Sequence, residues 1–213
     1  MATVKDILIQ GLADLGILPE GRVVDAFLLY LSELKKWNRA YNLTAITDDR
    51  EIIVKHFLDS LLYLKALPPS AQTLCDVGSG AGFPGMPIAL VRPDLSIALI
   101  EPSRKRCAFL RHVAKRIGAA NIEVMESVAE AVQDRQFDVV LTRATFSAAE
   151  LRKKAGHLVR TGGYLILSKG PKHEDELRDL GPALRPEIIP AELQQAGLSR
   201  YLLRLSAEPA ETL

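Results

Sequence analysis

Apolar residues recur every three or four positions along the first part of the chain, which is the spacing of one buried helix face. Two segments show the pattern, residues 22–37 and 54–64. A polar break at residues 47–50 separates them, and Asp48 within it is suited to cap the second helix. We therefore expect a helical N-terminal region, and the Pro68-Pro69 pair marks its end.

Beyond this break, short apolar runs alternate with helical patterns. The expected strands are 73–77, 96–101, 122–126, 137–142 and 163–168, and the expected helices are 84–91, 103–117, 128–133 and 147–159. Near-continuous apolar strands that alternate with helices are typical of a parallel sheet covered by helices on both faces. Two last strand-like runs, 185–190 and 201–205, are joined by a stretch too short for a helical crossover, which favours a hairpin edge.

These patterns predict an α/β fold with a mostly parallel seven-stranded sheet and an antiparallel edge strand. Residues 68–213 would form this domain, and the helical residues 1–67 would pack on it. The length of 213 residues, with 48% apolar and 25% charged residues, agrees with an ordinary globular chain and argues against disorder.

Composition narrows the cellular setting. No run approaches 18 apolar residues and the N-terminus has no signal-peptide pattern, so we expect a cytoplasmic protein without a membrane partner. Cys75 and Cys107 lack ligand-like spacing and a nearby His cluster, which predicts two buried thiols and no metal. We also expect a monomer.

The net charge of +1 argues against a uniform polycation that binds nucleic acid over its whole surface. The charge is nevertheless uneven. Residues 103–118 carry six Lys or Arg and no acid, residues 143–172 carry seven with Glu150 as the one acid, and acids gather at 174–179. Two basic segments next to expected strand ends are compatible with a local phosphate-binding rim.

A glycine-rich loop, residues 76–85, follows the first expected strand and precedes a helix. Glycines there allow a ligand to approach the backbone closely, so the loop predicts a nucleotide-like cofactor. Gly80, Gly82 and Gly85 match the dinucleotide pattern GxGxxG, with Glu101 19 residues beyond Gly82. The earlier start at Asp76 instead gives the acidic-x-Gly-x-Gly pattern of S-adenosylmethionine methyltransferases, in which the acid helps to hold the cofactor ammonium. Glu101 suits either cofactor, because a carboxylate can accept hydrogen bonds from ribose hydroxyls.

Several separated motifs carry a resemblance to a known family. They are 36–38 (Lys-Trp-Asn), 41–44 (Tyr-Asn-Leu-Thr), 56–60 (His-Phe-Leu-Asp-Ser), 76–89, 104–106 with 109–110, 143–144 (Arg-Ala) and 167–170 (Leu-Ser-Lys-Gly). In this order they resemble the GidB (RsmG) family of bacterial 16S ribosomal RNA guanine-N7 methyltransferases. The resemblance implies a Rossmann-like class I methyltransferase fold, S-adenosylmethionine as cofactor, and 16S ribosomal RNA or the small ribosomal subunit as partner.

The resemblance also implies site residues. The expected cofactor contacts are Gly78, Gly80, Phe83, Glu101, Ala129, Glu130 and Arg143, and the expected RNA contacts are Arg143, Lys169, Asn42 and His56. Arg143 and Lys169 follow strands four and five, where an open α/β sheet places its ligands. The Glu101-Pro102 pair departs from the acid-serine pair expected of the family, which puts neighbouring backbone contacts in doubt more than the carboxylate.

Guanine N7 carries a free lone pair, so methyl transfer to it requires no proton to be removed beforehand, and no catalytic acid or base is expected. Trp37 and Tyr41, four residues apart, are compatible with core packing or with stacking on a flipped base. Other functions stay open at this point: a methyltransferase acting on another RNA or on protein, a nicotinamide-dependent oxidoreductase, and a non-catalytic RNA-binding module.

Overall fold

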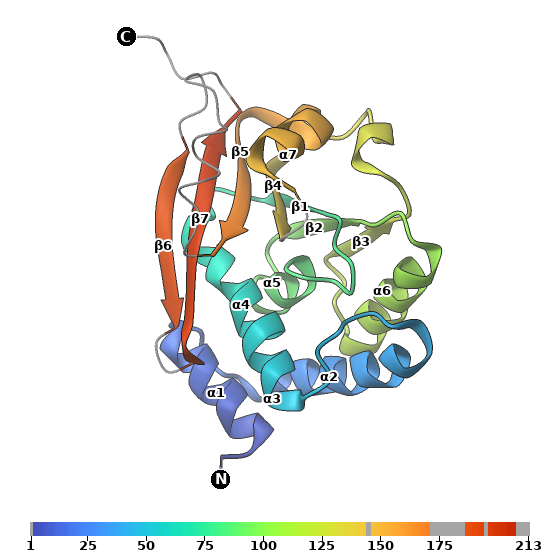
Figure 1. Ribbon diagram of the computed structural model, residues 1–213, viewed down its shortest axis with the longest axis vertical. Helices are drawn as coiled ribbons and strands as arrows, with labels where there is room; N and C mark the ends of the chain where they lie inside the picture. The colour runs from blue at the N-terminus through green and yellow to red at the C-terminus, as the bar shows by residue number, and fades with distance from the viewer. Residues whose placement is uncertain (1, 144–145, 171–185, 194–195, 208–213) are drawn as a thin grey trace.

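The computed structural model describes residues 2–143, 146–170, 186–193 and 196–207. Ala144, Arg185 and the charged residues at 172–179, all named above, lie outside the described residues. Seven strands form one sheet in the order β3-β2-β1-β4-β5-β7-β6 (Figure 1). They are β1 (Thr73–Val77), β2 (Ser96–Ile100), β3 (Ile122–Met125), β4 (Phe137–Arg143), β5 (Val159–Lys169), β6 (Glu187–Leu193) and β7 (Leu198–Ser206).

The strand directions confirm the predicted fold. Neighbouring strands from β3 to β5 are parallel, whereas β7 is antiparallel to both β5 and β6. The carboxyl ends of β1, β2 and β4 therefore lie along one edge of the sheet, which brings the residues that follow them close together.

The N-terminal region is helical, as predicted. It contains α1 (Val4–Asp14), α2 (Gly21–Tyr41), α3 (Asp49–Ile52), the π-helix η1 (Ile53–Leu58), α4 (Asp59–Leu61) and the 3-10 helix η2 (Leu62–Ala66). Asp48 caps α3, since its side chain accepts a hydrogen bond from Glu51 N at 2.9 Å. Along the rest of the chain lie α5 (Gly85–Val91), α6 (Arg104–Ile117), η3 (Ala129–Ala131), α7 (Ala148–Ala155) and η4 (Gly156–Leu158).

Two helix predictions were wrong in extent. The helix expected at 128–133 is only the 3-10 turn η3, because Val128 and Val132 on either side have extended backbone. The helix expected at 147–159 is divided into α7 and the 3-10 helix η4 that follows it. Val159 instead begins β5, where it pairs with Phe137 of β4. Pairing within the sheet outweighs the helical pattern at this end.

Helices cover both faces of the sheet. One buried cluster joins the N-terminal helices, α5 and α6 to one face, through residues such as Phe27, Phe57, Leu99 and Phe109. A second cluster packs α7 on the other face, around Val140 and Leu151 (Figure 1). The division of the chain at residues 67 and 68 stays a prediction.

Cys75 and Cys107 are buried free thiols. None of the helices in the described part of the chain has both the length and the apolar character needed to cross a membrane.

Candidate functional site

The loop between β1 and α5 folds back at the edge of the sheet. Its backbone bends through positive φ at Gly78 (71°), Gly80 (59°) and Gly82 (100°), a region that favours glycine. Gly78 N and Ser79 N donate to Ile100 O at 2.9 and 3.2 Å, which ties the loop to the end of β2. A side chain at position 82 would come within 2.6 Å of the Tyr30 hydroxyl, so both conformation and space require glycine there.

Glu101 follows β2 and lies against this loop with an exposed fraction of 2%. One of its carboxylate oxygens accepts from Gly80 N at 2.9 Å, and the other accepts from Ser103 N at 2.9 Å. The Arg106 guanidinium lies 3.7 Å from the carboxylate. Because each carboxylate oxygen has two lone pairs, each retains the capacity to accept one more hydrogen bond.

A cavity of about 270 Å³ opens in front of Glu101. We call it the strand-end cavity; it is lined by Val77, Gly78, Ile100, Glu101, Pro102, Arg106, Ser127, Val128, Ala129, Glu130, Phe146 and Lys154. Four of the expected cofactor contacts thus share one cavity: Gly78, Glu101, Ala129 and Glu130. The Glu101 carboxylate, together with the apolar side chains of Val128, Ala129 and Phe146 in the same lining, suits a nucleoside.

Sequence reasoning missed Phe146 and Lys154 on the wall of this cavity. Lys154 forms an ion pair with Glu130 at 2.6 Å and lies 5.8 Å from the centre of the Phe146 ring. The expected RNA contact Lys169 donates to Phe146 O at 2.9 Å, so the structure places it next to the cavity wall. No local motif marks Phe146; its position after β4 is the one signal that the sequence offers.

Asp76 lies beneath the glycine loop and is completely buried. One carboxylate oxygen accepts from Gly85 N at 2.7 Å, whereas the other has no hydrogen-bond partner within the described part of the chain. Burial raises the pKa of Asp76 to about 7. A carboxyl group in this position braces the loop, and direct contact with a ligand would require the loop to move.

Phe83, His56 and Arg143, which lie far apart in the sequence, meet beside the loop. The His56 ring stacks on the Phe83 ring with centroids 4.5 Å apart, and the Arg143 guanidinium carbon lies 4.8 Å from the Phe83 centroid. Arg143 also lies 3.2 Å from His56 Nδ1 and 3.8 Å from the buried Asp59 carboxylate. The N-terminal helices and β4 therefore build this part of the site together.

The contacts of His56 determine its protonation state. A guanidinium can only donate, so His56 Nδ1 accepts from Arg143 and Nε2 carries the proton. Nε2 then donates to Thr44 Oγ1 at 2.7 Å. Burial, together with the Arg143 charge, lowers the pKa of His56 to about 4, and the imidazole is neutral at physiological pH.

The remaining expected residues lie farther from the cavity. Asn42 ends α2 in the left-handed conformation, with φ of 50°, and is exposed. Trp37 packs on Phe109 and His112, with ring centroids 5.7 and 5.2 Å apart, which favours core packing over base stacking. Tyr41 is 44% exposed.

Comparison with known proteins identifies relatives. The family described as rRNA small subunit methyltransferase G (GidB) matches residues 24–187. A protein of Neisseria gonorrhoeae (strain NCCP11945), named ribosomal RNA small subunit methyltransferase G, is 42% identical over 173 residues, covering 81% of this chain and 83% of its own. One of the same name in Stenotrophomonas maltophilia (strain K279a) is 35% identical over 210 residues, covering 96% of each.

Solved structures agree with the fold. A SAM dependent methyltransferase from Aquifex aeolicus superposes with a TM-score of 0.55 at 19% identity, covering 82% of this chain and 97% of that one. At this level of identity the similarity concerns the fold alone, and it is the fold predicted from the sequence.

Proposed function

The chain belongs to the GidB family of rRNA small subunit methyltransferases, and from this membership we propose that it transfers a methyl group from S-adenosylmethionine to N7 of a guanine in 16S ribosomal RNA. The observation that supports the cofactor most directly is the strand-end cavity, where Glu101 lies against the glycine loop. This membership gives the dinucleotide interpretation of the same glycines no support.

The residues of the cavity fit the proposed cofactor. Glu101 retains one acceptor position on each oxygen, which matches the two hydroxyls of a ribose. Val128, Ala129 and Phe146 provide an apolar wall for the adenine. The Glu101 carboxylate lies near the place of a ligand that carries a positive sulfonium and an ammonium, whereas Asp76 is buried beneath the loop and supports it from within. The roles of Gly78, Gly80, Phe83, Glu130 and Arg143 toward the cofactor are part of the same proposal.

When bound, S-adenosylmethionine supplies an electrophilic methyl group attached to sulfur. The task of the chain is then to hold N7 in line with that group and to exclude water. No side chain has to act as a base, because N7 is already unprotonated, and the neutral His56 serves to position Arg143. Arg143 would contact guanine O6 or a neighbouring phosphate, since a bond to N7 would block the acceptor atom.

The RNA substrate implies action in the cytoplasm, on 16S ribosomal RNA or on the small ribosomal subunit, with this chain as a monomer. Lys169, Asn42 and His56 are proposed as further contributors to RNA binding, the last through Arg143.

The test is transfer of a tritiated methyl group. Purified protein is incubated with labelled S-adenosylmethionine and with either small subunits or naked RNA from a strain that lacks the enzyme, and the product is mapped by mass spectrometry. We expect label on one guanine of 16S ribosomal RNA as 7-methylguanine. Label on protein, on another RNA, or on no RNA would contradict the proposal.

A further inference from the structure

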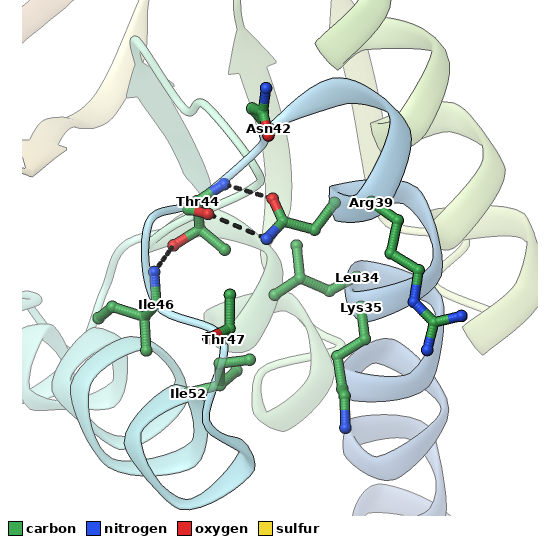
Figure 2. A pocket seen from close by; sticks show the side chains of 9 residues that line it. Leu34, Lys35, Arg39, Asn42, Thr44, Ile46, Thr47 and Ile52 are labelled. Atoms are coloured by element: carbon green, nitrogen blue, oxygen red, sulfur yellow. Dashed lines mark hydrogen bonds between the residues drawn. The ribbon is translucent and has the colours of Figure 1, made fainter.

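A second pocket, drawn in Figure 2, lies on the N-terminal helices and shares no lining residue with the strand-end cavity. It measures about 360 Å³ and lies between the end of α2, the following loop and α3. We call it the α2 pocket; it is lined by Leu34, Lys35, Asn38, Arg39, Asn42, Thr44, Ile46, Thr47 and Ile52. Much of the family motif at 36–44 lies here, and the proposed handling of the cofactor does not use it.

Hydrogen bonds fix the wall of this pocket (Figure 2). The Asn38 amide donates to Thr44 O at 3.0 Å and accepts from Thr44 N at 2.9 Å, so both of its polar atoms hold the loop. Thr44 Oγ1 accepts from Ile46 N at 3.1 Å. The pocket is therefore formed before any ligand arrives, which reduces the entropy lost on binding.

The lining combines positive charge with an apolar floor. Lys35 and Arg39 lie one turn apart on the same face of α2, and no lining residue is acidic. Lys35 pairs with Asp49, whereas the side chain of Arg39 has no hydrogen bond or ion pair with another described residue. An adjoining hollow of about 460 Å³ shares both cations, adds Lys36, and has Asp49 as its one acidic lining residue.

The floor consists of Leu34, Ile46 and Ile52; Leu34 and Ile52 are buried, so the half-buried Ile46 is the member of this group that offers apolar surface to a ligand. An apolar surface beside two cations matches a ribonucleotide, whose base has two apolar faces and whose phosphate is an anion. A single nucleotide of an unpaired strand can enter such a pocket, whereas a base within a duplex cannot.

The α2 pocket is connected to the site beside the glycine loop. Thr44 lines the pocket, and its hydroxyl accepts from His56, which stacks on Phe83. Two side chains thus separate the pocket from Phe83. A strand that delivers one base to the cofactor is well placed to lay a neighbouring nucleotide on α2.

We propose that the α2 pocket binds a nucleotide of the single-stranded RNA segment that contains the methylated guanine, with its phosphate at Arg39 and Lys35 and its base over Ile46. This inference rests on the proposed function. It adds a binding site that selects and orients the RNA without contact with the cofactor.

The test compares Arg39→Gln with Arg22→Gln. Both remove one exposed arginine from α2, but Arg22 lies at its far end. For Arg39→Gln we expect the KM for the RNA substrate to rise about tenfold, with unchanged kcat and unchanged S-adenosylmethionine affinity. The slope of log K for RNA against log salt should become less steep by about 0.7. Arg22→Gln should match the wild type.

A second measurement uses an oligoribonucleotide that carries 4-thiouridine beside the target guanine, and photocrosslinks should map to residues 39–47. Equal KM values and equal salt slopes for the two variants would overturn the inference, as would crosslinks confined to other segments. Absence of methyl transfer by the wild-type protein would instead contradict the proposed function, so the two failures are distinguishable.

Discussion

The strand-end cavity and the α2 pocket differ in the charge of the groups that surround them. The first is lined by two acidic side chains, Glu101 and Glu130, and two cations, Arg106 and Lys154, whereas the second presents Lys35 and Arg39 without any acid in its lining. A cationic cofactor and an anionic RNA require opposite environments. The net charge of +1 therefore averages over regions of different character, one with mixed charges and one with cations alone in its lining.

The two regions also differ in how they are held. Positive φ angles and buried carboxylates shape the glycine loop, so its geometry depends on the backbone. Amide and hydroxyl side chains shape the α2 pocket, with Asn38 and Thr44 as its main supports. We therefore expect substitutions in the first region to affect stability and cofactor binding, and substitutions at the exposed cations of the second to affect RNA binding.

The largest expected effect concerns Asp76. Burial raises its pKa to about 7 from an ordinary value of 3.8, so the folded protein keeps a proton that the unfolded chain loses. The stability that this proton contributes is complete below pH 3.8 and is lost as the pH rises toward 7. Asp76→Asn imitates the protonated form and should remove the loss, which is on the order of 4 kcal/mol over the whole range.

Urea unfolding of the cofactor-free protein at pH 5 and pH 8 measures this effect. Between pH 5 and pH 8, the free energy of unfolding of the wild type should fall relative to that of Asp76→Asn. The exposed Asp25→Asn is the control and should follow the wild type. Parallel pH profiles for Asp76→Asn and wild type would show that Asp76 is ionised in the fold.

The next effect concerns Glu101. Glutamine offers one acceptor oxygen where Gly80 N and Ser103 N both donate, and it cannot supply the charge-assisted bonds proposed for the ribose. We expect Glu101→Gln to weaken S-adenosylmethionine binding about a hundredfold by calorimetry, with RNA affinity unchanged. Glu123→Gln, an exposed carboxylate paired with Arg135, is the matched control. A loss of RNA affinity in Glu101→Gln would contradict the assignment of cofactor binding and RNA binding to separate regions.

His56 tests the junction between them. Its pKa of about 4 lies below the ordinary value of 6.5, so the unfolded chain takes up a proton that the folded imidazole resists. The corresponding stability is present above pH 6.5 and is lost as the pH falls toward 4, opposite in sign to the effect of Asp76. In urea titrations, His56→Gln should reduce this loss of stability at acid pH by on the order of 2 kcal/mol. His157→Gln should show the same loss of stability at acid pH as the wild type. An unchanged loss in His56→Gln would mean that His56 is protonated in the fold.

These residues differ in how far the sequence revealed them. The glycine loop and Glu101 were visible because their chemistry depends on residue type at fixed spacing after a strand. The mostly parallel direction of the strands followed from the same alternation of patterns, whereas their order in the sheet was not predicted. The contact of His56 with Arg143 was not visible, since it joins the N-terminal helices to β4 through packing that no local pattern encodes.

The α2 pocket was equally hidden. The family motif predicted that Asn42 contacts RNA. Its neighbours Arg39 and Thr47 belong to no motif, and they line the same pocket because of the turn after α2. The helix predicted at 128–133 failed for a related reason. The segment forms only a 3-10 turn between β3 and β4, where it lines the strand-end cavity, so its place in the fold outweighs its local helix propensity.

The smallest expected effect is the coupling between the two regions. Glu101 and Arg39 share no contact, so in the double variant Glu101→Gln/Arg39→Gln the losses in kcat/KM should multiply, with an interaction free energy below about 0.5 kcal/mol. The hydrogen bonds Thr44–His56 and His56–Arg143 connect the α2 pocket with the side chains beside the glycine loop, so binding in the pocket would affect the cofactor through them. A larger coupling that disappears when Thr44→Val is added would show that this route transmits binding energy. Additive losses would show that the chain selects RNA and cofactor independently and combines them only in the transfer step.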